Sequence, residues 1–374
     1  MKMKNHKLFT LIFFISILIS CNSDDSKKST DKDSFDRGAL LENWADNIII
    51  PSFENFASYT TDLEEKTEAF VQEPSEANLA SLRASYEEAY IQYQTVAMFG
   101  MGRAETINYR MFLNTYPVDE AAVKGKIESG SYNLELFTSY DEQGFPALDL
   151  LLNGLAEEDA GIVEFYTSHA DASEYRNYLQ AVSTRINGLT QEVLADWQNS
   201  FRDEFVSNTA SSNTGSVDRF TNDYVMYYEK NLRSGKIGIP AGAFTGNPVP
   251  QNVEAKYSEG LSKDLYLKAL ETVQNFFNGK HFGKSETGPS YKQYLDHLNS
   301  VKNSADLSSL INGQFDVIKQ QATNLNADFV EQIQTNNSVM LQAFDELQKN
   351  VVLMKVDMLQ ALSISVDYVD TDGD

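Results

Sequence analysis

Apolar residues recur at alternating steps of three and four along most of this chain, which is the spacing of one face of an α-helix. The clearest apolar stripes cover residues 79–96, 307–325 and 340–358. The alternation that is typical of a β-strand occurs only in the short segment 364–368. The periodicity therefore predicts an all-α protein, with 364–368 as its one strand candidate.

The ends of several helices can be placed from residue type. Ser75 precedes the first stripe and suits an N-cap, since its hydroxyl can accept a hydrogen bond from a backbone N–H of the first turn. Ser262 likewise opens a helix over 263–278, and a glycine closes it. An earlier helix that begins near Leu40 meets Pro51, which we expect to kink or break it.

Two stretches interrupt the helical pattern near the middle of the chain. Residues 207–216 are polar and resemble a linker in composition. Residues 235–252 hold three of the eight prolines and four glycines, so we expect an irregular loop there. These interruptions favour two helical bundles, an N-terminal one over 38–205 and a C-terminal one over 206–374.

The N-terminus combines a basic start with an apolar run over residues 8–19. This run is shorter than the roughly 20 residues that span a bilayer, but it suits a secretory signal peptide. It ends in Leu-Ile-Ser-Cys, which resembles the lipobox of bacterial lipoproteins, and Cys21 is the only cysteine of the chain. We expect residues 1–20 to be a signal peptide, Cys21 to carry the lipid that holds the protein on the membrane, and 21–37 to be a flexible polar tether.

The charge balance bears on partners. Asp and Glu number 54 against 30 Lys and Arg, which gives a formal net charge of −24. A surface this acidic repels phosphate backbones, so we expect no nucleic-acid partner.

Residues 143–154 form the most unusual internal segment. Within it, Gly144, Pro146 and Asp149 give the pattern Gly-x-Pro-x-x-Asp. This pattern resembles the Gly-x-His-x-x-Glu motif of the imelysin-like family, with proline at the histidine position and aspartate at the glutamate position. Three further segments resemble that family: residues 110–119, 232–242 and 365–374.

The resemblance implies an exported envelope protein, of a family that is often lipid-anchored, is tied to iron or haem uptake and was first classed among metallopeptidases. It also implies two bundles that are each similar to a four-helix bundle, with the motif on a central cleft between them. The residues expected to bind a ligand there come from the motif, from the helix before it and from the second half of the chain: Gly144, Pro146, Asp149, Arg103, Glu105, Lys236 and Pro240.

The departures from the motif argue against catalysis. Proline offers no ligand atom to a metal, and the chain has no histidine pair of the zincin type. We therefore expect a non-catalytic protein at the outer membrane that binds iron or haem, serves an outer-membrane uptake system and uses Asp149 as a candidate metal ligand. Asp149 could instead cap a helix or pair with Arg103 or Arg110. The alternatives are a metallopeptidase of the same fold and an interaction or scaffold lipoprotein without a small ligand.

Overall fold

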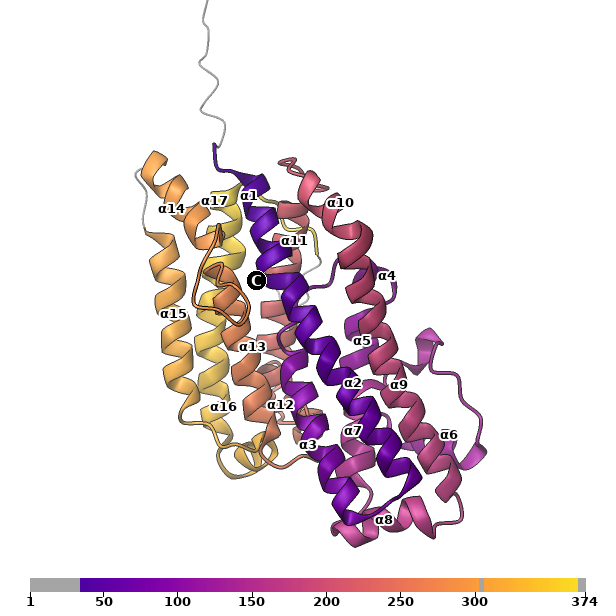
Figure 1. Cartoon of the computed structure of the whole chain (residues 1–374). Helices are drawn as coiled ribbons and strands as arrows, with labels where there is room; N and C mark the ends of the chain where they lie inside the picture. Colours follow the sequence, from indigo (N-terminus) through magenta and orange to yellow (C-terminus); the bar gives the residue numbers. More distant parts are fainter. Residues whose placement is uncertain (1–33, 303–305, 369–374) are drawn as a thin grey trace, which may run out of the picture. The chain divides into compact units, whose positions relative to one another are not determined.

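The computed structural model describes residues 34–302 and 306–368 of the chain (Figure 1). The signal peptide, Cys21 and most of the tether expected from the sequence lie outside these residues. The part from Phe35 onward forms one compact unit, and a division into two bundles after residue 205 stays a prediction. No helix of the described residues is long and apolar enough to cross a membrane.

The first half of the chain is built from α-helices with short π-helical or 3-10 segments (η) between some of them. Its elements are α1 (Arg37–Glu42), η1 (Asn43–Ile49), α2 (Ile50–Gln72), α3 (Glu76–Tyr93), α4 (Arg103–Thr106), α5 (Tyr109–Asn114), α6 (Glu120–Ser129), η2 (Phe137–Ser139), α7 (Gly144–Asp149), η3 (Leu150–Gly154), α8 (Asp159–Thr167), α9 (Ala172–Asp196), η4 (Trp197–Phe201) and α10 (Arg202–Ser207). The long helix α2 packs against α3 and α9, and α7 and α8 pack against α9 as well (Figure 1).

The second half of the chain is also built from α-helices with π-helical and 3-10 segments between some of them. Its elements are α11 (Ser216–Met226), η5 (Tyr227–Gly238), α12 (Ile239–Ala241), η6 (Pro250–Asn252), α13 (Leu261–Phe277), α14 (Tyr291–Lys302), α15 (Leu307–Ala322), α16 (Phe329–Val351), η7 (Val352–Met358) and α17 (Leu359–Leu362). Here α16 packs against both α15 and η5, and α13 contacts α15 and η5 (Figure 1).

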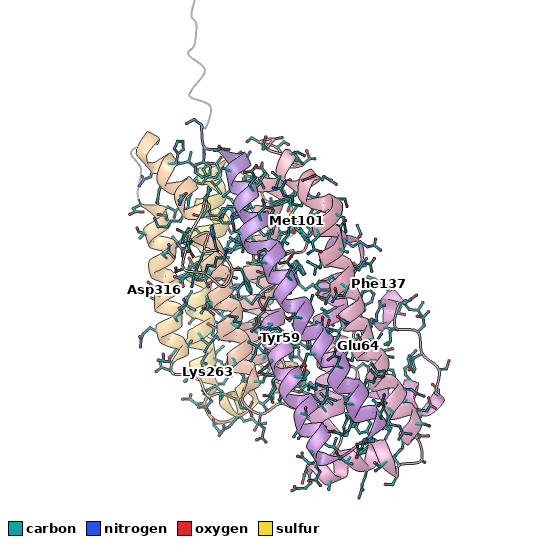
Figure 2. The ribbon with its side chains drawn as sticks, in the orientation of Figure 1. Tyr59, Glu64, Met101, Phe137, Lys263 and Asp316 are labelled. Carbon is teal, nitrogen blue, oxygen red and sulfur yellow. The ribbon has the colours of Figure 1, made fainter. Side chains whose placement is uncertain are left out.

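The apolar stripes predicted from the sequence form the interior. Figure 2 shows the side chains around the helices; Met101 is 2% exposed, whereas Phe137 of η2 is 59% exposed. The N-terminal helix joins the two halves, because Trp44 packs its ring 5.1 Å from Phe276 and 4.8 Å from Tyr291. Arg37 also forms an ion pair with Asp218 of α11. The start of the chain is therefore part of the packing of the second half.

The all-α prediction is confirmed, and the strand candidate is wrong. In the described residues, β-pairing is confined to one isolated bridge between Lys280 and Thr287. Residues 364–368 run without a partner strand, because their backbone is bonded to a side chain instead. Asn222 donates from Nδ2 to the carbonyl of Ser365 and accepts the N–H of Asp367.

One of the two N-caps predicted from residue type is confirmed. Ser75 caps α3 by accepting a hydrogen bond from the N–H of Asn78 at 3.3 Å. The helix placed at 263–278 is α13, but Ser262 does not open it: the N-cap is Gly260, and Ser262 lies in the first turn, where its hydroxyl accepts the N–H of Phe329 at 3.0 Å. Residues 207–216 form the connection between α10 and α11, as their composition indicated.

Two other expectations were wrong. Pro51 does not break the first helix, because the backbone stays helical from the π-helical η1 through Ile49 and Ile50 into α2. Proline has no N–H to donate there, and the carbonyl of Asn47, four residues earlier, accepts the N–H of Phe282 at 2.8 Å instead. The irregular loop expected over 235–252 begins only at Gly242, whose φ is +73°. Its first seven residues are helical within η5 and α12, because a π-helical segment accommodates the glycines.

Candidate functional site

The motif helix α7 is held so tightly that its first residue has to be glycine. Gly144 has φ +76°, and a Cβ there would lie 2.3 Å from the carbonyl oxygen of Leu113 and 2.5 Å from that of Phe112. Both carbonyls belong to α5. Pro146 is buried in the first turn of α7 and offers no polar side-chain atom. These two motif residues therefore position the helix.

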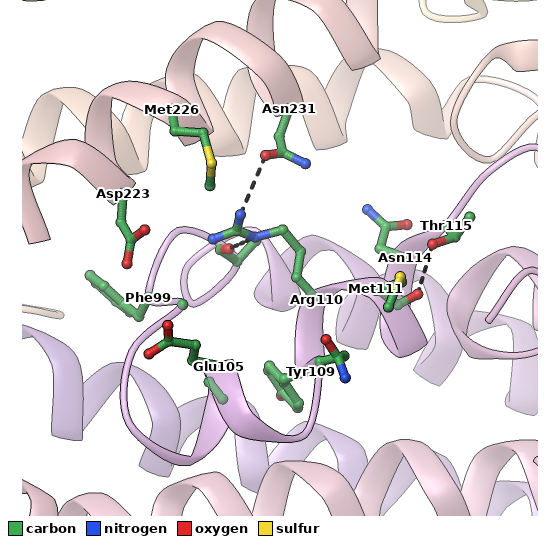
Figure 3. A pocket seen from close by; sticks show the side chains of 14 residues that line it. Phe99, Glu105, Tyr109, Arg110, Met111, Asn114, Thr115, Asp223, Met226 and Asn231 are labelled. Atoms are coloured by element: carbon green, nitrogen blue, oxygen red, sulfur yellow. Dashed lines mark hydrogen bonds between the residues drawn. The ribbon is translucent and has the colours of Figure 1, made fainter. Parts of the chain in front are cut away.

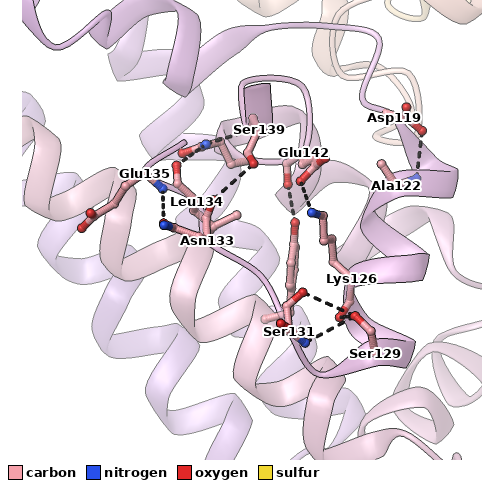
Figure 4. A network of polar contacts seen from close by, with 12 residues as sticks. Asp119, Ala122, Lys126, Ser129, Ser131, Asn133, Leu134, Glu135, Ser139 and Glu142 are labelled. Carbon is pink, nitrogen blue, oxygen red and sulfur yellow. Dashed lines mark hydrogen bonds and ion pairs between the residues drawn. The ribbon is translucent and has the colours of Figure 1, made fainter. Parts of the chain in front are cut away.

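The segment that leads into α7 is ordered by its own polar network (Figure 4). Gln143 donates from Nε2 to the carbonyls of Leu134 and Ser139 at 2.7 and 2.8 Å, and its Oε1 accepts from Nε of Arg185. The hydroxyl of Tyr178 donates to the carbonyl of the neighbouring Glu142 at 2.7 Å. These bonds fix the approach of the chain to α7.

Asp149, at the end of α7, is 2% exposed and fully engaged. Its Oδ2 accepts the backbone N–H of Tyr257 at 2.9 Å. Its Oδ1 accepts from Ser258 Oγ at 2.5 Å and from Asn153 Nδ2 at 3.3 Å. Burial raises the pKa of Asp149 to about 6, although these hydrogen bonds favour the ionised form and lower it. The carboxylate therefore fastens the loop of residues 253–258 to the motif helix.

The same loop carries a second buried charge. Lys236 of η5 forms an ion pair with Glu254, and the two side chains are 3% and 2% exposed. Burial lowers the pKa of Lys236, against the opposing effect of Glu254. The other oxygen of Glu254 accepts from Asn114 Nδ2 at 2.7 Å, and Asn114 Oδ1 accepts from the hydroxyl of Tyr90. We call residues 253–258 the bridging loop, because it bonds to both Asp149 and Lys236.

The structure thus brings some of the predicted site residues together and separates others. Gly144, Pro146 and Asp149 share α7, and Asp149 reaches Lys236 through the bridging loop. Pro240 is buried in α12, where its carbonyl accepts the N–H of Val249 at 2.8 Å. It contributes to the fold of the loop after α12.

Arg103 and Glu105 do not join Asp149. Arg103 pairs with Glu192 of α9, and its N–H bonds to Asp196 at 2.9 Å. Glu105 pairs with Arg219 at 2.8 Å. The pairing of Asp149 with an arginine, considered from the sequence, is wrong, because backbone and hydroxyl donors from the bridging loop satisfy the carboxylate instead.

A cavity of about 450 Å³ opens beside this network, and we call it the Arg110 pocket (Figure 3). Its polar and flexible lining comes from both halves of the chain: Glu105, Asn108, Arg110, Asp223, Met226 and Asn231. Arg110 projects from α5 across the cavity, with Nε bonded to the carbonyl of Ala97 at 2.7 Å and Nη1 3.5 Å from Asn231 Oδ1. Asn114, the partner of Glu254, also lines this pocket, so the pocket adjoins the buried network.

Because Gly100 has no side chain, the guanidinium of Arg110 can lie close to its backbone, with Asp223 nearby. A Cβ on Gly100 would lie 2.9 Å from Nη2 of Arg110 and 4.0 Å from Oδ2 of Asp223. In the described part of the chain, Arg110 and Asp223 form no ion pair with each other, and Nη2 makes no hydrogen bond. Burial raises the pKa of Asp223 to about 6, while Arg110 opposes this shift. The guanidinium therefore has an edge available to a ligand in the pocket.

The motif site does not fit a bare metal ion. Both oxygens of Asp149 accept hydrogen bonds from the protein, and Pro146 replaces the second ligand of the parent motif. Across residues 34–302 and 306–368, no group of three or more His, Cys, Asp or Glu side chains could hold a metal. Asp149 as a metal ligand has no support in this geometry.

Several residues that shape the site could not be selected from the sequence. Glu254 and Ser258 lie in a polar stretch without a motif, and Asp223 is an ordinary acidic residue of an acidic chain. Arg110 was considered only as an ion-pair partner. Its place as the first residue of the segment 110–119, which resembles the imelysin-like family, was the one available indication.

This chain belongs to the imelysin family, as a match to the family model shows. The family model described as imelysin, peptidase M75, matches residues 49–353, which is most of the chain. The resemblance found in the sequence is therefore confirmed.

Individual relatives are distant. Iron-regulated protein A of Synechococcus elongatus is 22% identical over 153 residues, which is 37% of this chain and 43% of that protein's length. An iron-regulated protein A precursor of Parabacteroides distasonis has a similar structure, with a TM-score of 0.69 at 16% identity. An imelysin-like protein of Psychrobacter arcticum gives 0.67 at 17%. Each structural match covers 89% of this chain and 97% of the other, and these two matches show the fold alone.

Proposed function

We propose that this chain is a lipid-anchored, non-catalytic binding protein of the cell envelope, and that it holds an iron carrier in the Arg110 pocket. The observation that carries this proposal is the available edge of the Arg110 guanidinium in a cavity of about 450 Å³. The motif helix offers no comparable opening, because Asp149 is buried and its oxygens are occupied.

The positive charge of Arg110 suits an anionic iron carrier better than a bare iron ion. A guanidinium binds carboxylates and other anionic oxygens through charge-assisted hydrogen bonds. Iron carriers present such groups, since ferric iron is complexed by anionic oxygens and haem bears two carboxylates. Arg110 would bind these groups, and Asn108 and Asn231 supply further polar contacts. The name iron-regulated protein A, borne by a relative, supports the link to iron.

The non-catalytic role rests on what the motif has lost. A zinc peptidase needs several nitrogen or oxygen ligands and an open coordination position. Pro146 supplies neither, and the hydrogen bonds to Asp149 occupy its carboxylate. The alternative of a metallopeptidase predicts proteolysis that a chelator abolishes.

The lipid anchor rests on the lipobox-like ending at Cys21. Lipid on this residue would hold the protein at the outer membrane, beside an iron or haem uptake system. Cys21→Ser should move the protein from the membrane fraction to the soluble fraction of the producing cells. Retention of the variant in the membrane fraction would contradict the anchor.

Binding can be measured on the chain from Ser34 onward, because the unit from Phe35 is compact by itself. We would titrate it separately with haemin and with ferric citrate, and follow absorbance and tryptophan fluorescence. Arg110→Gln should weaken binding of the true carrier by about tenfold or more, since a hydrogen bond to a charged group is worth ~1.5–3 kcal/mol. Arg110→Lys, which keeps the charge, should recover part of the affinity.

The matched control is Arg202→Gln, which removes an arginine that pairs with Asp46 on the surface. It should bind like the unchanged protein. Binding of one probe alone identifies the class of carrier. Failure of both probes, or equal loss in the two glutamine variants, would overturn the proposal, and the scaffold lipoprotein would become the better interpretation.

A further inference from the structure

A second cavity, of about 330 Å³, collects basic side chains on this acidic protein. It lies between α2, α13 and the loop of residues 278–290, and it shares no lining residue with the Arg110 pocket. Its basic lining consists of Lys268, Lys280, His281 and Lys284. We call it the lysine pocket. We propose that the lysine pocket binds the phosphate group of a small phosphorylated compound or of inorganic phosphate.

The loop that carries three of these side chains is held in one conformation. Within the loop, His281 N bonds to the carbonyl of Glu286 and Gly288 N to that of Gly279, both at 2.9 Å. The N–H of Phe282 donates to the carbonyl of Asn47 at 2.8 Å, which attaches the loop to η1. A preorganised loop loses little conformational entropy when a ligand binds.

The position of the loop against η1 is also fixed at its far end. Asn43 donates from Nδ2 to the carbonyl of Pro289 at 2.9 Å. The adjacent Gly288 leaves no space for a side chain, because a Cβ would lie 2.2 Å from Oδ1 of Asn43. The backbone that carries Lys280, His281 and Lys284 is therefore attached to η1 at two points.

The positive charges of the pocket are only partly compensated. Among the described residues, Lys280 and Lys284 form no ion pair. Lys268 has one partner, Glu271, at 3.3 Å, and that contact is partly exposed. The three ammonium groups thus outnumber the single carboxylate that lines the cavity. In a chain with a net charge of −24, most lysines can find a carboxylate nearby, so this excess favours an anionic ligand.

The hydrogen bonds already made in the pocket limit which groups can donate to a ligand. The hydroxyls of Ser52, Thr95 and Thr272 already donate to backbone carbonyls, at 2.6, 2.7 and 2.8 Å. Donors toward a ligand must therefore come from the lysines and from other side chains. Nε2 of His281 is buried without a hydrogen-bond partner, and it can donate when it carries a proton.

A phosphate group fits this arrangement better than a carboxylate does. It presents three or four oxygens in a tetrahedral arrangement and carries up to two charges near neutral pH, so it can accept from lysines on α13 and on the loop together. A carboxylate presents two oxygens in one plane. The phosphate of a monoester and the free ion share this chemistry, and the cavity of about 330 Å³ leaves space beside the phosphate for an organic group.

The test uses the chain from Ser34 onward at physiological salt, with inorganic phosphate and glucose 6-phosphate as separate probes in calorimetric titrations. Lys280→Gln with Lys284→Gln should weaken binding by about tenfold or more, because two charge-assisted contacts are removed. Tighter binding of the ester than of the free ion would identify a phosphorylated compound as the ligand, and the reverse would identify phosphate itself.

The matched control is the pair Lys292→Gln and Lys349→Gln, which removes two lysines from ion pairs on α14 and α16. It changes the net charge by the same amount, so it should bind like the unchanged protein. The imidazole resonances of His281 should shift when either probe is added. Absence of binding at millimolar concentrations, or equal loss in the control pair, would overturn the proposal.

Discussion

Lys236 and Glu254 meet in the interior of the protein, 18 residues apart in the chain, with both side chains almost wholly removed from solvent. Glu254 also accepts a hydrogen bond from Asn114 of α5. The carboxylate thereby joins η5, the bridging loop and the first half of the chain. Removing either partner of such a buried ion pair leaves the other charge without a counter-charge and without solvating water, which strongly destabilises the folded protein.

Glu254→Gln should therefore destabilise the protein strongly. It leaves the ammonium of Lys236 buried without a counter-charge, which costs about 3–5 kcal/mol in the free energy of unfolding. Chemical denaturation measures this loss. The control is Glu128→Gln, whose partner Lys124 lies in an exposed pair on α6 and whose removal should cost about 1 kcal/mol or less. Equal losses in the two variants would show that the buried pair does not hold the loop.

Gly144→Ala should also be poorly tolerated. The alanine would have to adopt φ +76° and place its Cβ 2.3 Å from the carbonyl oxygen of Leu113. Backbone strain and steric overlap each cost about 1–3 kcal/mol. Gly313→Ala in α15 is the matched control, because its Cβ would meet nothing within 4 Å, and it should stabilise the helix by about 0.5–1 kcal/mol. A thermal melt of Gly144→Ala that matches the unchanged protein would contradict the tight contact of α7 with α5.

The pKa of Asp149 predicts a pH-dependent stability. Burial raises this pKa to about 6 in the folded protein, so the folded state holds the proton more tightly than the unfolded chain does. The contribution of Asp149 to stability is therefore present at low pH and is lost as the pH rises through 6. Between pH 5 and 7 the free energy of unfolding, taken relative to Asp149→Asn, should fall by about 1 kcal/mol. A difference that is constant with pH would contradict a shifted pKa.

The pKa of Asp223 predicts a pH dependence of ligand binding. Four charged groups act on this carboxyl: Arg110 and Arg219 lower its pKa, Glu105 and Asp367 raise it, and burial brings it to about 6. Below pH 6 the carboxyl becomes neutral and no longer repels an anionic carrier in the Arg110 pocket. Affinity for ferric citrate should therefore rise between pH 7.5 and 5.5, and Asp223→Asn should remove most of this rise. If the affinity of Asp223→Asn rises with falling pH as much as that of the unchanged protein, the charge of Asp223 does not act on the bound ligand.

Much of the fold could be predicted because it depends on repeated local signals. The stripe that became α3 repeats its apolar residues over five turns, and its N-cap Ser75 is chemically distinctive. The errors arose where backbone geometry departs from the ordinary helix. Residue type does not indicate that η1 and η5 are π-helical. The sequence therefore predicts a kink or break at Pro51 and a loop from Gly235 onward.

The site was less predictable, because its contacts join residues far apart in the chain. Asp149 could be selected from its place in the motif, but its partner Ser258 lies 109 residues away in a stretch with no pattern. The family resemblance groups Arg103 and Glu105 with the motif, but partners on α9 and α11 satisfy their charges. Charge type can be read from a sequence, whereas the choice among several partners depends on packing.

The bridging loop has a consequence for how this protein can be divided. Asp149 belongs to the first half of the chain, and its partners Tyr257 and Ser258 belong to the second. Glu254 in turn takes a hydrogen bond from Asn114 of the first half. Fragments cut within 208–215 would each keep one side of these contacts, so neither should fold alone. Mixed together, they should restore each other's missing donors and acceptors and assemble as a split protein.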